Sequence, residues 1–231
     1  MNKFLKLIFM ILYLSSMRCS YGKSMINKSE QKNENKYLIL LDLPMPIITP
    51  RMILRPPQPG DGVVVNKAIF ESFEALHEYM PFAKDMPTVE ETEMFVRQAA
   101  ANWILKEEKE PYLPIFMFDC ITKEFIGSTG YLNIKWEIPV LEIGYWIKTS
   151  YSSKGLMTEA VNALTRYAFE YFHANRVTIT CDSSNVKSKR ISERLGFCFE
   201  GTLKNARLTV DGKLSDTLVY ARYNIAGLPE L

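Results

Sequence analysis

Residues 141–161 read LEIGYWIKTSYSSKGLMTEAV, a strand-like run that passes through a polar loop directly into a helix-like run. Apolar residues recur at helical spacing from Leu156 to Ala168, so the helix should bury one face and hold a fixed position. Its first turn carries backbone N–H groups without helical partners at the positive end of the helix dipole, which together suit a phosphate or pyrophosphate. Gly155 lets the backbone approach such an anion closely. Taken alone, the loop is equally typical of a polar segment that only caps a helix.

The rest of the chain supplies alternating strand and helix signals around this unit. Residues 88–91 read TVEE, which places Glu91 at the capping-box position after the Thr88 hydroxyl. Asp211 and Gly212 suit the tight turn of a C-terminal hairpin. We expect strands at residues 51–55, 112–119, 125–136, 141–147 and 176–181, and helices at residues 61–79, 88–107, 155–172 and 187–195. This order predicts an α/β fold in which one mixed sheet is flanked by helices.

The composition is that of an ordinary globular chain. Its 231 residues are 47% hydrophobic and 23% charged, which allows one good core. The net charge of +2, without a long run of Lys and Arg, argues against direct binding of nucleic acid. Four scattered cysteines without a CxxC pair, together with two histidines, make a metal site hard to build. We expect Cys120, Cys181 and Cys198 to be buried free thiols rather than disulfides.

A second informative segment begins just after the expected strand at residues 176–181. Residues 185–201 read NVKSKRISERLGFCFEG and fall on the pattern NxxSxxxxExxGFxxEG. With these two segments the chain resembles the GNAT acetyltransferase family, and more closely its ribosomal-protein N-terminal amine acetyltransferases, from about Thr49 to Asn224. EIGYWI at residues 142–147 and KGLMTEA at residues 154–160 are similar to that family's fourth strand and pyrophosphate loop. The resemblance implies a mixed, mostly antiparallel sheet that splays at its fourth and fifth strands, with acetyl-CoA as co-substrate.

The resemblance also assigns the co-substrate to particular residues of this chain. Tyr145, Trp146 and Ile147 would run along the pantetheine arm. The pyrophosphate would be held by the backbone of Ser153, Lys154, Gly155, Leu156, Met157 and Thr158, and the region near the pantetheine would be contacted by Asn185 and Ser188. One departure lies in the loop, where Ser152 stands at a position that the family fills with Gln or Arg, and Met157 at a position for a small residue. The resemblance therefore implies that one side-chain donor to the phosphates is missing at Ser152.

The implied reaction is direct attack of a neutral amine on the thioester carbonyl, which needs a base for the amine proton and a donor for the leaving thiolate. Glu142, on the strand that borders the cleft, is the expected base, acting directly or through water; the alternative is a strand carboxylate paired with a neighbouring cation. Ser188 matches the family position that faces the CoA sulfur, and the alternative is a helix N-cap. Tyr131 and Tyr220 are further candidates for the hydroxyl donor. Arg207 stands where some ribosomal-protein acetyltransferases carry a carboxylate, which weakens any claim to the same acceptor.

The acceptor itself stays open at this point. We expect its pocket between residues 80–86, where Phe82 and the adjacent methionines could pack on an extended peptide, and the C-terminal hairpin. A protein or peptide N-terminal amine is the favoured acceptor, and a small amine of the aminoglycoside or polyamine kind is the alternative. A non-catalytic acyl-CoA-binding module is a further alternative. The sheet edges and the hairpin would permit a dimer without demanding one.

The first 44 residues differ from the rest. Lys3 and Lys6 precede an apolar run from Leu7 to Leu14, and small and polar residues follow, with Gly22 a weak cleavage candidate. The run is shorter than the roughly 20 apolar residues that cross a bilayer, so we expect no stable membrane insertion. Two interpretations remain: an export signal, or an upstream extension with the working start at Met25 or Met45. Because acetyl-CoA is a cytoplasmic metabolite, we favour the second, with an acetyltransferase domain over residues 45–231.

Overall fold

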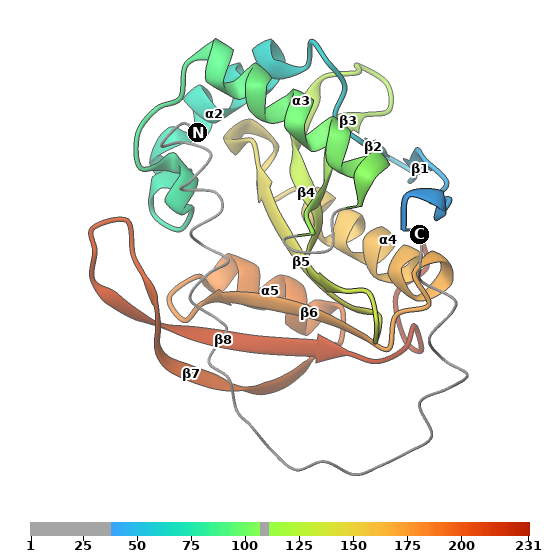
Figure 1. Ribbon diagram of the computed structural model, residues 1–231. Coiled ribbons are helices and arrows are strands. Elements are labelled where there is room, and N and C mark those ends of the chain that lie inside the picture. The colour runs from blue at the N-terminus through green and yellow to red at the C-terminus, as the bar shows by residue number, and fades with distance from the viewer. Residues whose placement is uncertain (1–37, 107–110) are drawn as a thin grey trace.

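A single twisted sheet organises the computed structural model, which describes residues 38–106 and 111–231. Eight strands lie in the order β1-β2-β3-β4-β5-β6-β8-β7 (Figure 1). The strands are β1 (Ile47–Ile48), β2 (Met52–Arg55), β3 (Leu113–Asp119), β4 (Phe125–Lys135), β5 (Val140–Ile147), β6 (Arg176–Asp182), β7 (Cys198–Leu208) and β8 (Leu214–Arg222). Neighbouring strands pair antiparallel except β5 and β6, which pair parallel.

Helices cover both faces of the sheet. They are α2 (Gly62–His77), α3 (Val89–Leu105), α4 (Leu156–Tyr171) and α5 (Val186–Arg194), with short 3-10 turns η2 (Leu38–Leu40), η3 (Pro81–Ala83) and η4 (Thr149–Tyr151). Along β3, Ile115 and Met117 pack into the core cluster that contains α4, whereas Phe116 and Phe118 pack into the cluster with α2. This alternation is the two-residue period of a strand that is buried on both faces.

The expected α/β fold with a mixed, mostly antiparallel sheet is confirmed. Every expected helix and strand is present, with bounds within two residues of the expectation. The Thr88 side chain accepts a hydrogen bond from the Glu91 N–H, and the Glu91 carboxylate accepts one from the Thr88 N–H, so the capping box forms. The hairpin turn differs in detail, because only Gly212 has a positive φ (+77°). The short strand β1 was not expected, and it shifts the numbering so that the splaying pair is β5 and β6.

The parallel pair of β5 and β6 is short. Its register runs through Val140–Arg176, Leu141–Val177 and Glu142–Thr178, and no pair follows. Beyond that point β5 stays paired with β4 as far as Ile147, and β6 stays paired with β8. Figure 1 shows β6, β8 and β7 running at a steep angle to β3, β4 and β5. The two halves of the sheet therefore part after Glu142.

A bulge on β4 lies opposite the point where the strands part. The pairing of β4 with β5 shifts register between Leu132 and Lys135, and Asn133 has a φ of +51°. A bulge bends its strand and increases the local right-handed twist, which turns β5 away from a flat continuation beside β6. It also turns the Asn133 side chain toward β5, where its amide Nδ2 donates to Glu142 Oε2 over 2.8 Å.

The packed core extends to residues before Met45. Leu38 is buried in the main cluster, with Leu41 and Leu43 against it. The Tyr167 hydroxyl on α4 donates to the Pro44 carbonyl over 2.9 Å. The segment that precedes β1 thus contributes to the domain. The expected signal-like run at residues 7–14 lies outside the described residues.

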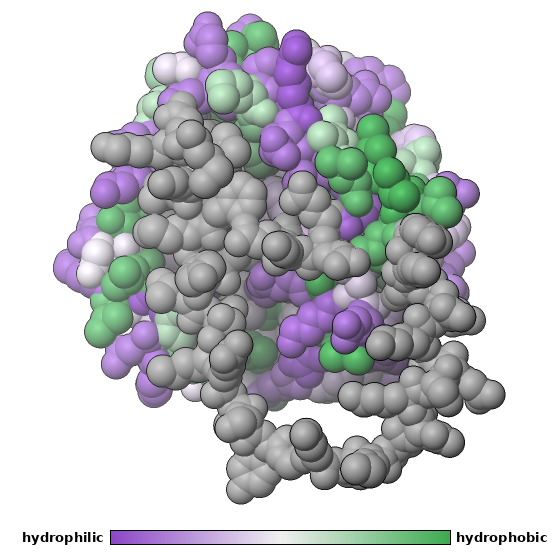
Figure 2. Space-filling model, viewed as in Figure 1, coloured by the Kyte–Doolittle hydropathy of each residue, from purple (hydrophilic) through white to green (hydrophobic). Residues whose placement is uncertain are grey.

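Exposed apolar side chains gather near the C-terminal end of α3. Ile39, Leu40, Ile104 and Leu105 are all exposed, and they come from η2 and the end of α3, which contact each other. Figure 2 shows hydrophobic surface over the side of the molecule on which η2 and the end of α3 lie in Figure 1. Among residues 38–106 and 111–231, no helix is long and apolar enough to cross a membrane.

The cysteines follow the expectation only in part. Cys181 is buried on β6, and burial raises the pKa of its thiol. Cys120 is half-buried and Cys198 is exposed, so the expectation of a buried thiol is wrong for Cys198. Cys198 opens β7, the edge strand of the sheet, and most residues of this strand are exposed. All three are free thiols.

One ion pair ties the outer strands together. Glu200 on β7 accepts hydrogen bonds from the Arg176 guanidinium at the start of β6 and from the Tyr223 hydroxyl just after β8. These bonds, from Arg176 first and then Tyr223, lower the pKa of Glu200 to about 2. The Glu of the GFxxEG motif therefore has two structural partners, one on β6 and one directly after β8.

We predict that Glu200→Gln lowers the free energy of unfolding by about 1 kcal/mol at neutral pH. Because the folded-state pKa lies below the ordinary value of 4.5, the contribution of Glu200 is fully present above pH 4.5 and is lost as the pH falls through about 2. Denaturant unfolding of both proteins across this range measures the difference. Glu193→Gln, which alters a more exposed pair with Lys189 at 3.8 Å, is the matched control and should change stability by less than about 0.5 kcal/mol. If the two proteins still differed by the same unfolding free energy near pH 2, the Glu200 carboxylate could not be the source of that difference.

Candidate functional site

The loop between β5 and α4 offers a row of unpaired backbone donors. Ser153 and Gly155 have φ values of +62° and +77°, which turn the chain sharply before α4 begins at Leu156. The first helical hydrogen bond that α4 makes to this loop runs from the Glu159 N–H to the Gly155 carbonyl. Within the described part of the chain, the N–H groups of residues 153–158 have no acceptor. Consecutive free N–H groups at a helix N-terminus bind anions such as phosphates.

Arg51, at the start of β2, holds this loop in place. Its Nε lies 2.6 Å from Glu159 Oε2, and its backbone N–H donates to Glu159 Oε1 over 3.1 Å. Its Nη1 donates to the Lys154 carbonyl over 2.9 Å. No local sequence signal marks Arg51, because its contact with Lys154 joins residues 103 positions apart and depends on the packing of β2 against α4.

A second cation stands on the loop itself. Lys154 Nζ lies 4.9 Å from the centre of the Tyr151 ring, a cation–π distance. The Tyr151 hydroxyl in turn donates to Glu124 Oε2 over 2.5 Å, and this hydrogen bond raises the pKa of Tyr151. Tyr151 therefore anchors the exposed Lys154 side chain near the row of N–H groups.

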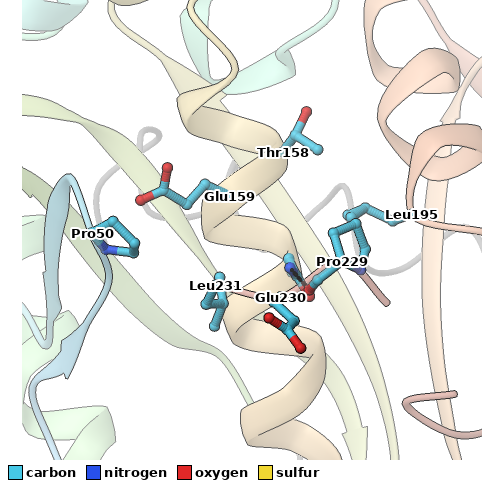
Figure 3. Close-up of a pocket in the computed structure, with 8 residues that line it drawn as sticks. Pro50, Thr158, Glu159, Leu195, Pro229, Glu230 and Leu231 are labelled. Atoms are coloured by element: carbon cyan, nitrogen blue, oxygen red, sulfur yellow. Dashed lines mark hydrogen bonds between the residues drawn. The ribbon is translucent and has the colours of Figure 1, made fainter. Parts of the chain in front are cut away.

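A hollow of about 270 Å³ lies beside the first turn of α4. Figure 3 shows Thr158 and Glu159 on α4, with Pro50 on one side and Leu195 and Pro229 on the other. Asn162 Nδ2 donates to the Pro229 carbonyl over 2.8 Å, which fixes the wall formed by the C-terminal residues. The hollow therefore adjoins the loop, and it lies outside the gap between β5 and β6.

Glu142 occupies the last paired position before β5 and β6 part. Its Oε2 accepts from Asn133 Nδ2 at 2.8 Å, and its Oε1 accepts from Thr180 Oγ1 at 2.5 Å. Over the described residues, no Lys or Arg forms an ion pair with Glu142. The alternative of an ordinary strand carboxylate paired with a cation is therefore not what the structure holds. Two neutral donors instead orient a half-buried carboxylate at the mouth of the gap.

Hydroxyl and thiol groups gather on the α5 side of the gap. Ser188 Oγ lies 2.8 Å from the Tyr145 hydroxyl oxygen. Burial raises the pKa of Tyr145 well above its ordinary value, so its hydroxyl keeps its proton at neutral pH. Cys181 on β6 and Ser192 on α5 are both buried beside this pair of hydroxyls.

The helix cap at this point is Asn185. Its side-chain Oδ1 accepts the Ser188 N–H over 3.0 Å, so the alternative that gave Ser188 the capping role is wrong. The Asn185 Nδ2 group is not engaged in that bond. Ser188 keeps its hydroxyl for Tyr145, one turn into α5.

Strand alternation sends the expected site residues to two faces. Tyr145 and Ile147 pack against the cluster that contains α4, whereas the Trp146 ring packs against Phe82 at a centroid distance of 6.4 Å. Glu142 lies four residues from Trp146, so it shares the Trp146 face. The expected base and the expected hydroxyl donor thus approach the gap from opposite faces of the sheet.

The alternative hydroxyls are placed differently. Tyr131 is fully buried, and its hydroxyl donates to the Leu164 carbonyl over 2.7 Å, so it belongs to the packing beneath α4. Tyr220 is buried on β8, with its ring 5.3 Å from that of Phe199. Arg207 Nε donates to Thr217 Oγ1 over 3.1 Å, which holds this side chain on the hairpin.

The expected acceptor segment closes one side of the open end of the gap. Met80, Phe82 and Met86 are half-buried and pack against the α2 cluster, so they serve first as core. Tyr79 reaches Ser184 in the loop after β6: its pKa is raised by a hydrogen bond to Glu78 and by burial, and a hydrogen bond with Ser184 opposes that rise. The end of α2 and the loop before α5 therefore meet where β6 ends.

Comparison with known proteins identifies relatives of this architecture. The model of the acetyltransferase (GNAT) domain matches residues 51–198. The ribosomal-protein-serine acetyltransferase of Escherichia coli is 32% identical over 99 residues, which are 43% of this chain and 55% of that protein. The ribosomal protein uS5-alanine N-acetyltransferase of Escherichia coli is 33% identical over 106 residues, which are 46% of this chain and 54% of that protein. The chain thus spans about half the length of these curated relatives.

A solved structure supports the fold independently. The ribosomal L7/L12 alpha-N-protein acetyltransferase in complex with coenzyme A superposes with a TM-score of 0.68 at 21% identity, over 78% of this chain and 98% of that one. At this identity the similarity concerns the fold.

Proposed function

Because the chain belongs to the GNAT acetyltransferase family, we propose that it transfers the acetyl group of acetyl-CoA to a primary amine, foremost the N-terminal amine of a protein or peptide. The observation that carries this proposal is the parting of the parallel β5–β6 pair near a helix N-terminus with free N–H groups. An acyl carrier with a thin amide-containing arm and a diphosphate fits these two features together. The gap receives the arm, and the loop receives the diphosphate.

The co-substrate would be bound mainly by backbone. The edge of β5 at Tyr145, Trp146 and Ile147 has no partner strand on the β6 side, so its polar groups are free to pair with the amides of the pantetheine arm. The N–H groups of residues 153–158 would hold the diphosphate, with Lys154 adding a charge. Asn185 would contribute Nδ2 near the arm while its Oδ1 caps α5.

Glu142 would be the general base. The neutral amine attacks the thioester carbonyl, the C–N bond forms as the C–S bond breaks, and the amine proton passes to Glu142 directly or through a water. The hydrogen bonds from Asn133 and Thr180 support this role because they fix the carboxylate at the mouth of the gap. They leave further lone pairs on both carboxylate oxygens for the proton.

Ser188 would protonate or hydrogen-bond the departing thiolate. Its link to Tyr145 supplies a buried, protonated hydroxyl behind it, so a negative charge on sulfur meets two O–H groups in sequence. The two faces of β5 separate the general base from the thiolate donor. The amine would arrive on the Glu142 face, and the sulfur would leave toward α5.

The acceptor assignment rests on the relatives and on the open end of the gap. Two relatives are named as acetyltransferases of a serine or an alanine of ribosomal proteins. In this chain the end of α2, at Tyr79, and the β7–β8 hairpin, at Arg207, flank the route to Glu142. An extended N-terminus would enter between them. We place the activity in the cytoplasm, where acetyl-CoA is available.

The experiment that tests this function follows thiol release from acetyl-CoA by the full-length chain. The acceptors are a panel of peptides with different N-terminal residues, the same peptides with blocked N-termini, and small polyamines and aminoglycosides. We expect turnover with free peptide N-termini and none with blocked ones. Turnover confined to small amines would contradict the peptide assignment, and CoA binding without turnover on any acceptor would favour a non-catalytic module.

We predict that Glu142→Gln lowers kcat about 100-fold or more at neutral pH while changing the KM for acetyl-CoA little, because the amide cannot accept the amine proton. Steady-state kinetics at a saturating acceptor concentration measure both constants. Glu137→Gln, the same change on an exposed residue in the turn before β5, is the control and should leave both constants unchanged. Equal kcat values for Glu142→Gln and the unmodified protein would show that Glu142 is not the general base.

A further inference from the structure

We propose that Arg51 is a diphosphate ligand of the co-substrate site, an inference that rests on the proposed function. Arg51 immediately precedes β2, far from the β5–α4 loop in sequence, and its side chain reaches the Lys154 carbonyl of that loop. Its guanidinium would donate to the CoA diphosphate from the side, beside the row of backbone N–H groups.

Three hydrogen bonds set the orientation of this side chain. Nε and the backbone N–H bind the two oxygens of Glu159, and Nη1 binds the Lys154 carbonyl. Only 12% of the Glu159 side chain is exposed, so this residue holds the Arg51 guanidinium at a fixed place beside α4. A planar guanidinium fixed at Nε and Nη1 has its remaining N–H groups in determined directions.

The remaining donor points along the loop. Nη2 lies 3.5 Å from the position that a Cβ on Gly155 would occupy, so it stands beside the residue at which the loop turns into α4. Nη2 has no acceptor among residues 38–106 and 111–231, and 47% of the Arg51 side chain is exposed. A fixed cation with free N–H groups next to free backbone donors is suited to an oxyanion rather than to further protein contacts.

The nearby arginine at the end of β2 is engaged differently. Arg55 donates from Nη1 and Nη2 to the two carboxylate oxygens of Asp61, both at 2.7 Å, and from Nη1 to the Pro56 carbonyl. Both of its terminal nitrogens are therefore used within the protein. Of these two arginines, Arg51 alone keeps a terminal nitrogen without an acceptor among the described residues.

The test compares three ligands by calorimetry on the full-length chain: CoA, dephospho-CoA and pantetheine. Because a charge-assisted hydrogen bond to the diphosphate is lost, Arg51→Ala should raise the Kd of CoA and of dephospho-CoA by the same factor, about 10- to 100-fold. The Kd of pantetheine, which has no diphosphate, should not change. Arg97→Ala removes an Arg–Glu pair on α3 and is the matched control, with no change for any ligand.

Glu159→Gln separates a direct contact from a mere effect on loop shape. It removes the charge that pairs with Arg51 but leaves the Arg51 cation beside the loop, so the Kd of CoA should stay within about threefold of the unmodified value. An equal loss in Glu159→Gln and Arg51→Ala would overturn the ligand role, as would an unchanged Kd in Arg51→Ala. A loss restricted to CoA would assign Arg51 to the 3′-phosphate and also overturn it. If the unmodified chain binds neither CoA nor dephospho-CoA, the proposed function itself fails and the inference falls with it.

Discussion

The constraint on which the structure depends is the length of the parallel β5–β6 pair. Its register ends at Glu142–Thr178, although both strands continue beside their other neighbours. A longer ladder would close the sheet and leave no unpaired strand edge in its middle. The bulge at Asn133 turns β4 and β5 away from β6 at this point, and the same residue binds the carboxylate that stands at the opening. Fold and candidate site therefore share one local cause.

The two faces of β5 divide the proposed chemistry. Glu142 and Trp146 lie toward α2, and Tyr145 and Ile147 lie toward α4 and α5. An acyl group held in the gap would meet the amine and its base from one face and the hydroxyls of Tyr145 and Ser188 from the other. The anionic part of the co-substrate would lie beyond the end of β5, where the loop donors and Arg51 meet. The two-residue period of β5 separates the base from the thiolate donor. The phosphate ligands are separate from both because they lie beyond the end of the strand.

Much of the fold and part of the candidate site could be predicted from the sequence, because the strongest sequence signals were local. Helical spacing after Gly155 and the TVEE capping box fixed α4 and α3 to within two residues. What escaped prediction depends on packing between distant segments: the Arg51 contact with Lys154, the Asn133 bulge, and the link between Tyr145 and Ser188. The N-cap of α5 was left open as an alternative role for Ser188, whereas Asn185 carries it, since both residue types suit that role and only the chain path decides. Cys198 was expected inside because its neighbours are apolar, yet it lies on the edge strand.

In the proposed complex, one CoA molecule occupies both the open edge of β5 and the free N–H groups that follow it. Hydrogen–deuterium exchange of the full-length chain with and without CoA tests this placement. We expect slower exchange on CoA addition in residues 143–147 and 153–158, with the β7–β8 hairpin unchanged in the absence of acceptor. Unchanged exchange in both segments at a CoA concentration that saturates binding, or protection confined to the hairpin, would contradict it.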